Sequence, residues 1–287
     1  MPERGTTHRP LLRRTAAGCS ALLSLVLACS CGLGDGQGGP RTHGQASPSG
    51  ARSAGPGNDA AGKARPKPVP GDNTPSAPPP AQQPPAPPDS SVTYHTAGGG
   101  RTVALTFDDG PGPATGQILD LLAKYHVKAT FCQVGEEIVN YPDIDRRILA
   151  EGHRLCDHTL THPQPMFTLS SAQQAQEVLD AKATIIEAGG PGTRVTWFRA
   201  PGGDFTTANV KTAVEHGMRP LGWTVDPVDW SDPGVDSIVT TVKQELQPGG
   251  IVLFHDGGGD RSQTVTAVSR LLPWLIRQGY GFDFPEN

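Results

Sequence analysis

Acids, histidines and one arginine recur in five short clusters along the last two-thirds of the chain. A carboxylate and two histidines form a catalytic zinc site when one coordination position stays open to water. An acid and a histidine outside such a set can serve as general base and general acid. The five clusters begin at Asp108, His158, Arg199, Asp226 and Leu253. Their residue types predict metal-assisted hydrolysis.

The first two clusters contain the predicted metal ligands. Asp108 and Asp109 are adjacent at the end of a predicted strand, so their carboxylates cannot both point the same way, and one can face a metal while the other faces a substrate water. His158 and His162 are four residues apart, a spacing that would place both on one face of a helical turn. Together with Asp109 they make a two-histidine, one-carboxylate set. Taken alone, an Asp-Asp-Gly sequence is also typical of a solvated turn.

Two further clusters supply groups that could work beside the metal. Arg199 precedes a Pro-Gly turn and could pair with Asp108, which would orient that base. A surface position for this arginine is the alternative. His255 follows a predicted strand and is placed to act as a general acid. It needs a carboxylate partner to stay protonated near neutral pH, and we predict Asp226 as that partner.

Two apolar side chains belong to the last two clusters. Trp230 follows Asp226, and Leu253 precedes His255. They could line a small apolar pocket for a methyl group. Ordinary core packing is the commoner role for any single tryptophan or leucine, so this interpretation depends on the other clusters.

Strand-like and helix-like runs alternate through this part of the chain. Predicted strands span 102–107, 129–134, 152–156, 194–198, 220–225 and 250–254, and predicted helices span 116–125, 144–151, 172–188, 209–215, 235–246 and 263–278. This repeated order predicts a parallel sheet or barrel with helices outside. Each cluster follows the C-terminal end of a predicted strand, which is where active sites of such folds assemble.

A single catalytic domain is predicted over residues 92–287. Residues 32–91 are rich in Gly, Pro, Ala, Ser and Gln, so burial cannot offset the entropy of ordering them, and they predict a solvated linker. Residues 1–31 combine a basic start with a short apolar stretch, which is typical of a secretory signal peptide. That stretch ends at Cys29 in a sequence resembling a bacterial lipobox, so lipid anchoring and simple cleavage are both open. We therefore expect an extracellular or cell-surface protein.

Charge divides unevenly between the two predicted parts. Before Val92 there are 9 Lys and Arg against 5 Asp and Glu, a net charge of +4, whereas the remainder has 15 against 23, a net charge of −8. An acidic domain without basic clusters argues against binding to nucleic acid. No segment beyond the signal is long and apolar enough to cross a bilayer, so we expect membrane contact only through the signal or a lipid anchor. We expect a monomer.

Two of the five cysteines, Cys132 and Cys156, lie in the predicted domain. Their spacing is not that of a zinc ribbon or a redox pair. In an exported protein they could form a disulfide. Two buried free thiols are the alternative, because free cysteine packs well in cores.

All five clusters, in this order, resemble the motifs of the polysaccharide deacetylases, the NodB-type carbohydrate esterases of family 4. The resemblance covers essentially the whole predicted domain. It implies a distorted (β/α) barrel and a divalent metal, usually zinc, with cobalt as a possible substitute. By resemblance, Asp109, His158 and His162 hold the metal, Asp108 is the base oriented by Arg199, His255 is the acid tuned by Asp226, and Trp230 and Leu253 cradle the acetyl methyl group.

The chain departs from the family in its third motif. An aromatic residue often follows the proline there, and this chain has Gly202. The family's oxyanion donor at that position is expected to be a backbone N–H, which glycine keeps. The side-chain wall beside the sugar is lost.

The resemblance implies hydrolysis of N-acetyl groups from amino sugars of a cell-wall-type polysaccharide, such as peptidoglycan or chitin-like oligomers. An acetylxylan esterase is the second reading, since the same groups could cleave an ester. A catalytically silent wall-binding lipoprotein is the third. It predicts the loss of a metal ligand, the base or the acid, and none of these is missing.

Overall fold

The computed structural model describes residues 89–286. The predicted signal peptide with its Cys29 lies outside the described residues, as does nearly all of the predicted linker. Between residues 89 and 286, no helix has the length and apolar character needed to cross a membrane.

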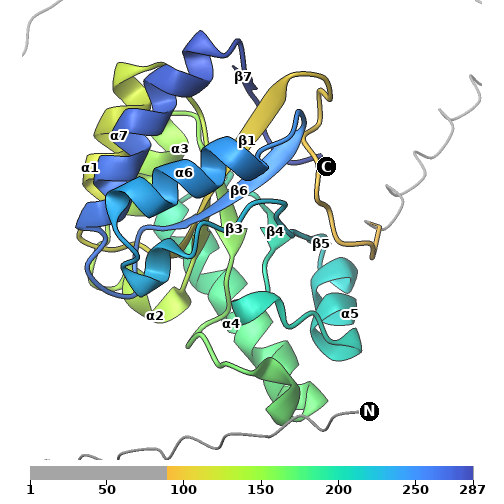
Figure 1. The fold of residues 1–287 in the computed structure, drawn as a ribbon. Coiled ribbons are helices and arrows are strands. Elements are labelled where there is room, and N and C mark those ends of the chain that lie inside the picture. The colour runs from red at the N-terminus through yellow and green to blue at the C-terminus, as the bar shows by residue number, and fades with distance from the viewer. Residues whose placement is uncertain (1–88, 287) are drawn as a thin grey trace, which may run out of the picture. The chain divides into compact units, whose positions relative to one another are not determined.

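Strands and helices alternate in the predicted order (Figure 1). The strands are β1 Thr102–Gly110, β2 Thr130–Gln133, β3 Arg154–Asp157, β4 Val195–Phe198, β5 Arg219–Pro220, β6 Gly250–His255 and β7 Gly281–Phe282. The helices are α1 Thr115–Lys124, α2 Gly135–Ile138, α3 Ile144–Ala150, α4 Ser171–Gly189, α5 Thr207–Glu215, α6 Val235–Glu245 and α7 Ser262–Arg277, with short 3₁₀ helices η1 Met166–Thr168, η2 Pro201–Gly203 and η3 Asp229–Ser231. The sequence did not predict α2, β7 or the 3₁₀ helices.

The strands form one parallel sheet in the order β5-β4-β3-β2-β1-β6, and β7 pairs with the first residues of β1. The predicted strand over 220–225 is shorter than expected, because only its start pairs with β4. The chain then crosses to the other edge of the sheet, where the Leu253 N–H donates to the Val225 carbonyl at 2.9 Å. This crossing joins the two edges and confirms the distorted (β/α) barrel.

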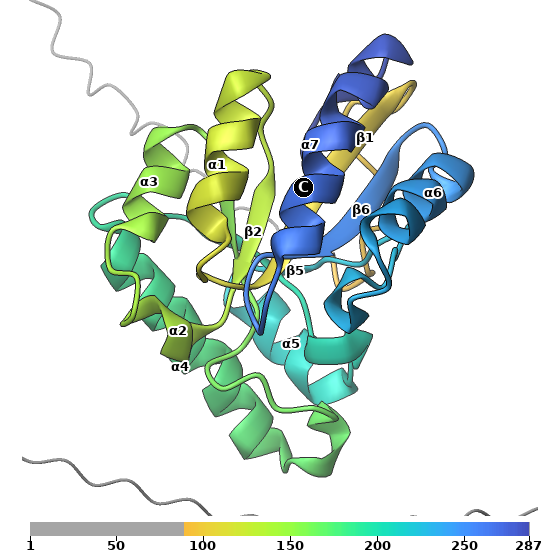
Figure 2. The same ribbon diagram turned by 60° about the vertical axis from the view of Figure 1, so that its left-hand side comes forward.

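Helices cover the outside of the curled sheet (Figure 2). Neighbouring helices contact one another in the order α6, α7, α1, α3, α4, α5, which follows the order of the strands they connect. α4 begins at a capping box, in which Ser170 and Gln173 each bond the other's backbone N–H. Its buried Val178, Ala181 and Ile185 recur at helical spacing, so one face packs against the sheet.

Alternation along the strands separates two apolar layers. Outward residues such as Phe107, Phe131 and Phe254 pack under the helices, and their rings stack across β2, β1 and β6. Inward residues form a smaller cluster inside the barrel, made of Ala104, Cys132, Cys156, Trp197, Leu221 and Ile251. Cys132 and Cys156 are directly paired across β2 and β3 and form a disulfide, which decides between the two alternatives left by the sequence.

The same alternation sets the direction of the functional side chains. Asp108 is four residues after the inward Ala104, and His255 is four residues after the inward Ile251. Both therefore point into the barrel at the C-terminal end of their strands.

Candidate active site

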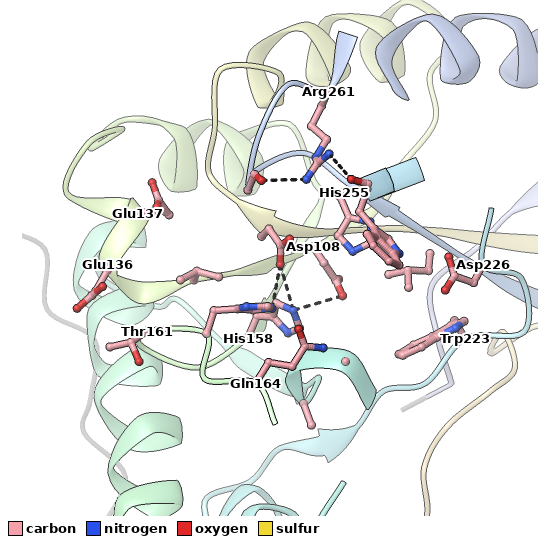
Figure 3. A pocket seen from close by; sticks show the side chains of 18 residues that line it. Asp108, Glu136, Glu137, His158, Thr161, Gln164, Trp223, Asp226, His255 and Arg261 are labelled. Atoms are coloured by element: carbon pink, nitrogen blue, oxygen red, sulfur yellow. Dashed lines mark hydrogen bonds and ion pairs between the residues drawn. The ribbon is translucent and has the colours of Figure 1, made fainter. Parts of the chain in front are cut away.

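A cavity of about 600 Å³ opens at the C-terminal ends of the strands (Figure 3). Nine of the ten residues predicted from the sequence line it: Asp108, Asp109, His158, His162, Gly202, Asp226, Trp230, Leu253 and His255. The tenth, Arg199, is fully buried and contacts Asp108. The folded chain therefore brings together side chains that are spread over nearly 150 positions of sequence, from Asp108 to His255.

The three predicted metal ligands face one another. Asp109 Oδ1 lies 3.4 Å from His158 Nε2 and 3.3 Å from His162 Nε2. This carboxylate oxygen is buried and has no hydrogen-bond partner among the described residues, a costly state that a cation would relieve. His158 Nδ1 lies 2.6 Å from the Arg199 carbonyl, so Nδ1 carries the proton and the Nε2 lone pair faces Asp109. A carboxylate and two imidazole nitrogens fit a zinc ion.

Electrostatics favour the metal-binding charge state in two of the three side chains, Asp109 and His162. Burial alone would raise the pKa of Asp109, but the surrounding histidines, His158 foremost, hold it well below its ordinary value. The charges of Asp108 and Asp109 in turn raise the pKa of His158 against the effect of burial, so a metal bound at its Nε2 would have to displace a proton there. Burial, together with the neighbouring His158, lowers the pKa of His162. The lowered values favour an ionised Asp109 and a neutral His162 ring, which are the forms in which these two side chains bind a metal.

The histidines do not lie on a helical turn, so that part of the prediction was wrong. They lie in the loop after β3, where Thr159 and His162 adopt left-handed conformations with φ of 71° and 56°. Asp157 accepts the Thr159 N–H at 2.8 Å, and the Thr159 hydroxyl accepts the His162 N–H at 3.1 Å. These local bonds tighten the loop, which brings the ring centroids of His158 and His162 to 5.0 Å.

The predicted pairing of Asp108 with Arg199 is confirmed. Arg199 Nη1 donates to Asp108 Oδ1 at 2.6 Å, and both side chains are buried. The same guanidinium donates to the Thr106 hydroxyl and to the carbonyls of Leu221 and Gly222. Asp108 Oδ2 lies on the other side, 3.6 Å from His158 Nε2. One carboxylate oxygen is thus fixed, and the other faces the metal ligands.

Asp226 is not the partner of His255, which corrects the prediction. His255 Nδ1 lies 2.8 Å from Asp229 Oδ1, and the His255 backbone N–H donates to Asp229 Oδ2 at 2.9 Å. Asp226 lines the cavity and accepts the Val228 N–H instead. The physical reason is local: Val228 is left-handed with φ of 54°, and the following η3 directs Asp229 inward. Asp226 and Asp229 belong to the same cluster, so the sequence motif does not distinguish them. Only the burial of Asp229 beside His255 identifies it as the partner.

His255 is held in its protonated form by this arrangement. Burial by itself would lower the pKa of His255. The hydrogen bond and charge of Asp229, with the more distant charges of Asp108 and Asp109, outweigh burial and raise the pKa above its ordinary value. This shift favours the protonated ring beside the cavity.

The remaining predicted residues form part of the cavity wall. Leu253 is buried, whereas Trp230 is 52% exposed at the rim. Gly202 lies in η2 with a left-handed φ of 60°.

The sequence did not single out Arg261, which is buried and donates to the carbonyls of Gly257, Gly258 and Trp230. Arg261 thereby links the loop after β6 to the loop that carries Trp230. The sequence could not reveal this role, because a single arginine in a loop belongs to no repeating pattern.

Comparison with known proteins gives a consistent result. Residues 95–221 match the family model described as polysaccharide deacetylase. The chain is 42% identical over 199 residues to a chitooligosaccharide deacetylase from Bradyrhizobium sp. (strain ANU 289), across 65% of this chain and 90% of that protein. It is 40% identical over 202 residues to a peptidoglycan-N-acetylglucosamine deacetylase from Bacillus cereus, across 67% and 89%. A crystal structure of a peptidoglycan N-acetylglucosamine deacetylase superposes with a TM-score of 0.62 at 30% identity, across 67% and 89% of the two chains.

Proposed function

Because the chain belongs to the polysaccharide deacetylase family, we propose that it is a metal-dependent enzyme that hydrolyses the acetamido group of amino sugars in a cell-wall-type glycan. The observation that carries this proposal is the convergence of three sets on one cavity: the Asp109 metal triad, the Asp108–Arg199 pair and the His255–Asp229 pair. The names of the relatives, chitooligosaccharide deacetylase and peptidoglycan-N-acetylglucosamine deacetylase, support this substrate class.

Asp109, His158 and His162 would hold the metal, which we propose to be zinc, with cobalt able to replace it. When bound, zinc polarises a carbonyl oxygen and lowers the pKa of water. The ligands follow β1 and β3, which pair with opposite edges of β2, and the Cys132–Cys156 disulfide links β3 to β2.

Asp108 is the general base in this proposal. Arg199 fixes its Oδ1, so Oδ2 faces the metal ligands. From there Oδ2 can accept a proton from the water that attacks the amide carbon. The buried arginine also keeps the carboxylate oriented before the substrate arrives.

His255 is the general acid. Its Nδ1 is occupied by Asp229, which leaves Nε2 to donate a proton to the amide nitrogen as the C–N bond breaks. The amine then departs and acetate remains. The Gly202 N–H stabilises the oxyanion that develops on the carbonyl oxygen, and Leu253 and Trp230 surround the acetyl methyl group.

A panel of defined substrates tests this function. Acetate release is measured from N-acetylglucosamine oligomers, peptidoglycan fragments and acetylated xylan, with the Asp108→Asn variant as the catalytic control. We expect release from the amide substrates and a loss of orders of magnitude in that variant. Preferential release from xylan would instead indicate an O-deacetylase, and near-normal activity of Asp108→Asn would remove the base from the mechanism.

We also propose that the domain works outside the membrane, either released or lipid-anchored at Cys29. The signal-like sequence of residues 1–31 supports export, as does the Cys132–Cys156 disulfide, because such bonds persist in oxidising compartments. Mass analysis of the mature N-terminus tests this. A lipidated or cleaved end supports export, and an intact Met1 in the cytoplasm contradicts it.

A further inference from the structure

Two consecutive glycines in the turn of the third motif adopt left-handed conformations. Neighbouring side chains occupy the space that side chains at these two positions would need. Gly202 and Gly203 have φ of 60° and 73°. A Cβ on Gly202 would overlap the carboxamide of Gln164, and a Cβ on Gly203 would lie 2.9 Å from the Trp223 ring. The wall that an aromatic side chain could have formed at Gly202 is therefore built from Gln164, which comes from the histidine loop.

The Gln164 side chain reaches the cavity, and its carboxamide makes no hydrogen bond to the other described residues that line it. Its side chain is exposed and lines the same cavity as the metal triad. Figure 3 shows its side chain pointing to the cavity, with no bond drawn to the other lining residues. The loop on either side is held by its backbone, through the His162 N–H to Thr159 and the Phe167 N–H to Asp204. The carboxamide is thus placed by the loop while its polar atoms stay available.

The carboxamide of Gln164 is better able to bind the hydroxyl groups of a sugar than to act on the amide that is hydrolysed. It offers two N–H donors and one carbonyl acceptor, so it can donate to and accept from the hydroxyl groups of a pyranose ring. The groups that act on the acetamido carbon and nitrogen are already assigned to Asp108, His255 and the metal ligands. Gln164 stands on the Gly202 side of the cavity, where the family's aromatic wall beside the sugar is missing.

We propose that Gln164 is a specificity-determining residue that hydrogen-bonds a hydroxyl group of the sugar whose acetamido group is hydrolysed. This inference rests on the proposed function, because it concerns the sugar ring of that substrate. Gln164 takes no part in proton transfer. It acts on the binding of the glycan, and a substrate without a sugar ring does not use it.

Gln164→Ala tests this directly. With N-acetylglucosamine oligomers, kcat/KM should fall about five- to tenfold, the effect of one neutral hydrogen bond, and the change should lie mostly in KM. With para-nitrophenyl acetate, which has no sugar, kcat/KM should be unchanged. The exposed Gln117 on α1 provides the matched control, and Gln117→Ala should leave both substrates unaffected. An equal loss on both substrates, or no loss on the oligomers, overturns the proposal.

A binding measurement separates this inference from the proposed function. In the Asp108→Asn background, calorimetry of the zinc-loaded protein with N-acetylglucosamine oligomers should show a Kd about five- to tenfold weaker when Gln164 is also replaced by alanine. An unchanged Kd overturns the role of Gln164 even if the unsubstituted enzyme releases acetate. If that enzyme fails to release acetate, the proposed function is overturned. The Kd comparison still tests whether Gln164 binds the sugar.

Gly202→Ala supplies an independent variant. Its methyl group displaces the carboxamide, so Gly202→Ala should weaken oligomer binding. In the Gln164→Ala background that carboxamide is already absent, so the same substitution should weaken binding less than it does when Gln164 is present, while the strain at its positive φ is common to both backgrounds. Fully additive effects contradict the proposed contact.

Discussion

Replacing Asp229 with asparagine tests the acid pair most sharply. Buried Asp229 accepts hydrogen bonds from His255 Nδ1, the His255 backbone N–H and the Thr264 hydroxyl at 2.7–2.9 Å. Asparagine keeps the shape of the side chain but removes the charge that favours the protonated ring. A hydrogen bond to a charged group contributes about 1.5–3 kcal/mol. Since about 1.4 kcal/mol is a tenfold change in rate, kcat/KM should fall about 10- to 150-fold.

The pH dependence of kcat/KM identifies the cause of that loss. Asp229 raises the pKa of His255 against the opposing effect of burial, so its removal lowers that pKa. The protonated acid is then lost at a lower pH, and the alkaline limb of the profile moves to lower pH. Asp226→Asn is the matched control, because Asp226 lines the same cavity without bonding His255, and it should stay within about twofold of wild type. An unshifted profile in Asp229→Asn, or a shift in Asp226→Asn instead, refutes the reasoning.

Three further predictions concern the metal and the scaffold. His162→Ala should abolish stoichiometric zinc binding in elemental analysis while the far-ultraviolet circular dichroism stays native, and retained zinc would exclude this residue as a ligand. Replacing Cys132 and Cys156 together by alanine should lower the free energy of unfolding by about 3.5 kcal/mol, because the disulfide closes a loop across 24 residues and so reduces the entropy of the unfolded chain. An unchanged urea midpoint would contradict a stabilising disulfide. Burial raises the pKa of Asp145 to about 7, so the folded chain binds this proton more tightly than the unfolded chain and loses stability as pH rises toward 7. Asp145→Asn should therefore be more stable than wild type in urea near neutral pH, the gain should vanish near about pH 4, and a constant difference would argue against the titration.

Much of the site could be predicted from the sequence because it follows from strand ends. Inward positions alternate along β1 and β6, so Asp108 and His255 had to enter the barrel at the same edge. Residue type then grouped Asp109 with His158 and His162, and Arg199 with Asp108, and the structure places each group together. The disulfide could not be decided in this way, since adjacent strands also accommodate two free thiols.

The errors came from loops, where local backbone conformation overrides spacing. Asp226 and Asp229 are both acids of one cluster, and only the left-handed Val228 and the following η3 decide which of them meets His255. The two histidines do lie together, but the helical premise was wrong, because four-residue spacing also suits a tight loop with positive φ. Gln164 and Arg261 each lie against a loop from a distant part of the sequence, and no pattern within either loop predicts such a meeting.

Acetate release from an N-acetylglucosamine oligomer, measured by mass spectrometry with zinc-loaded and chelator-treated protein, tests the central claim most directly. The cavity joins Asp109, His158 and His162 to the proposed base and acid, so we predict release by the zinc-loaded protein, loss with the chelator and recovery when zinc is restored. Equal release with and without zinc, or none from any N-acetylated oligomer, would contradict a metal-dependent N-deacetylase.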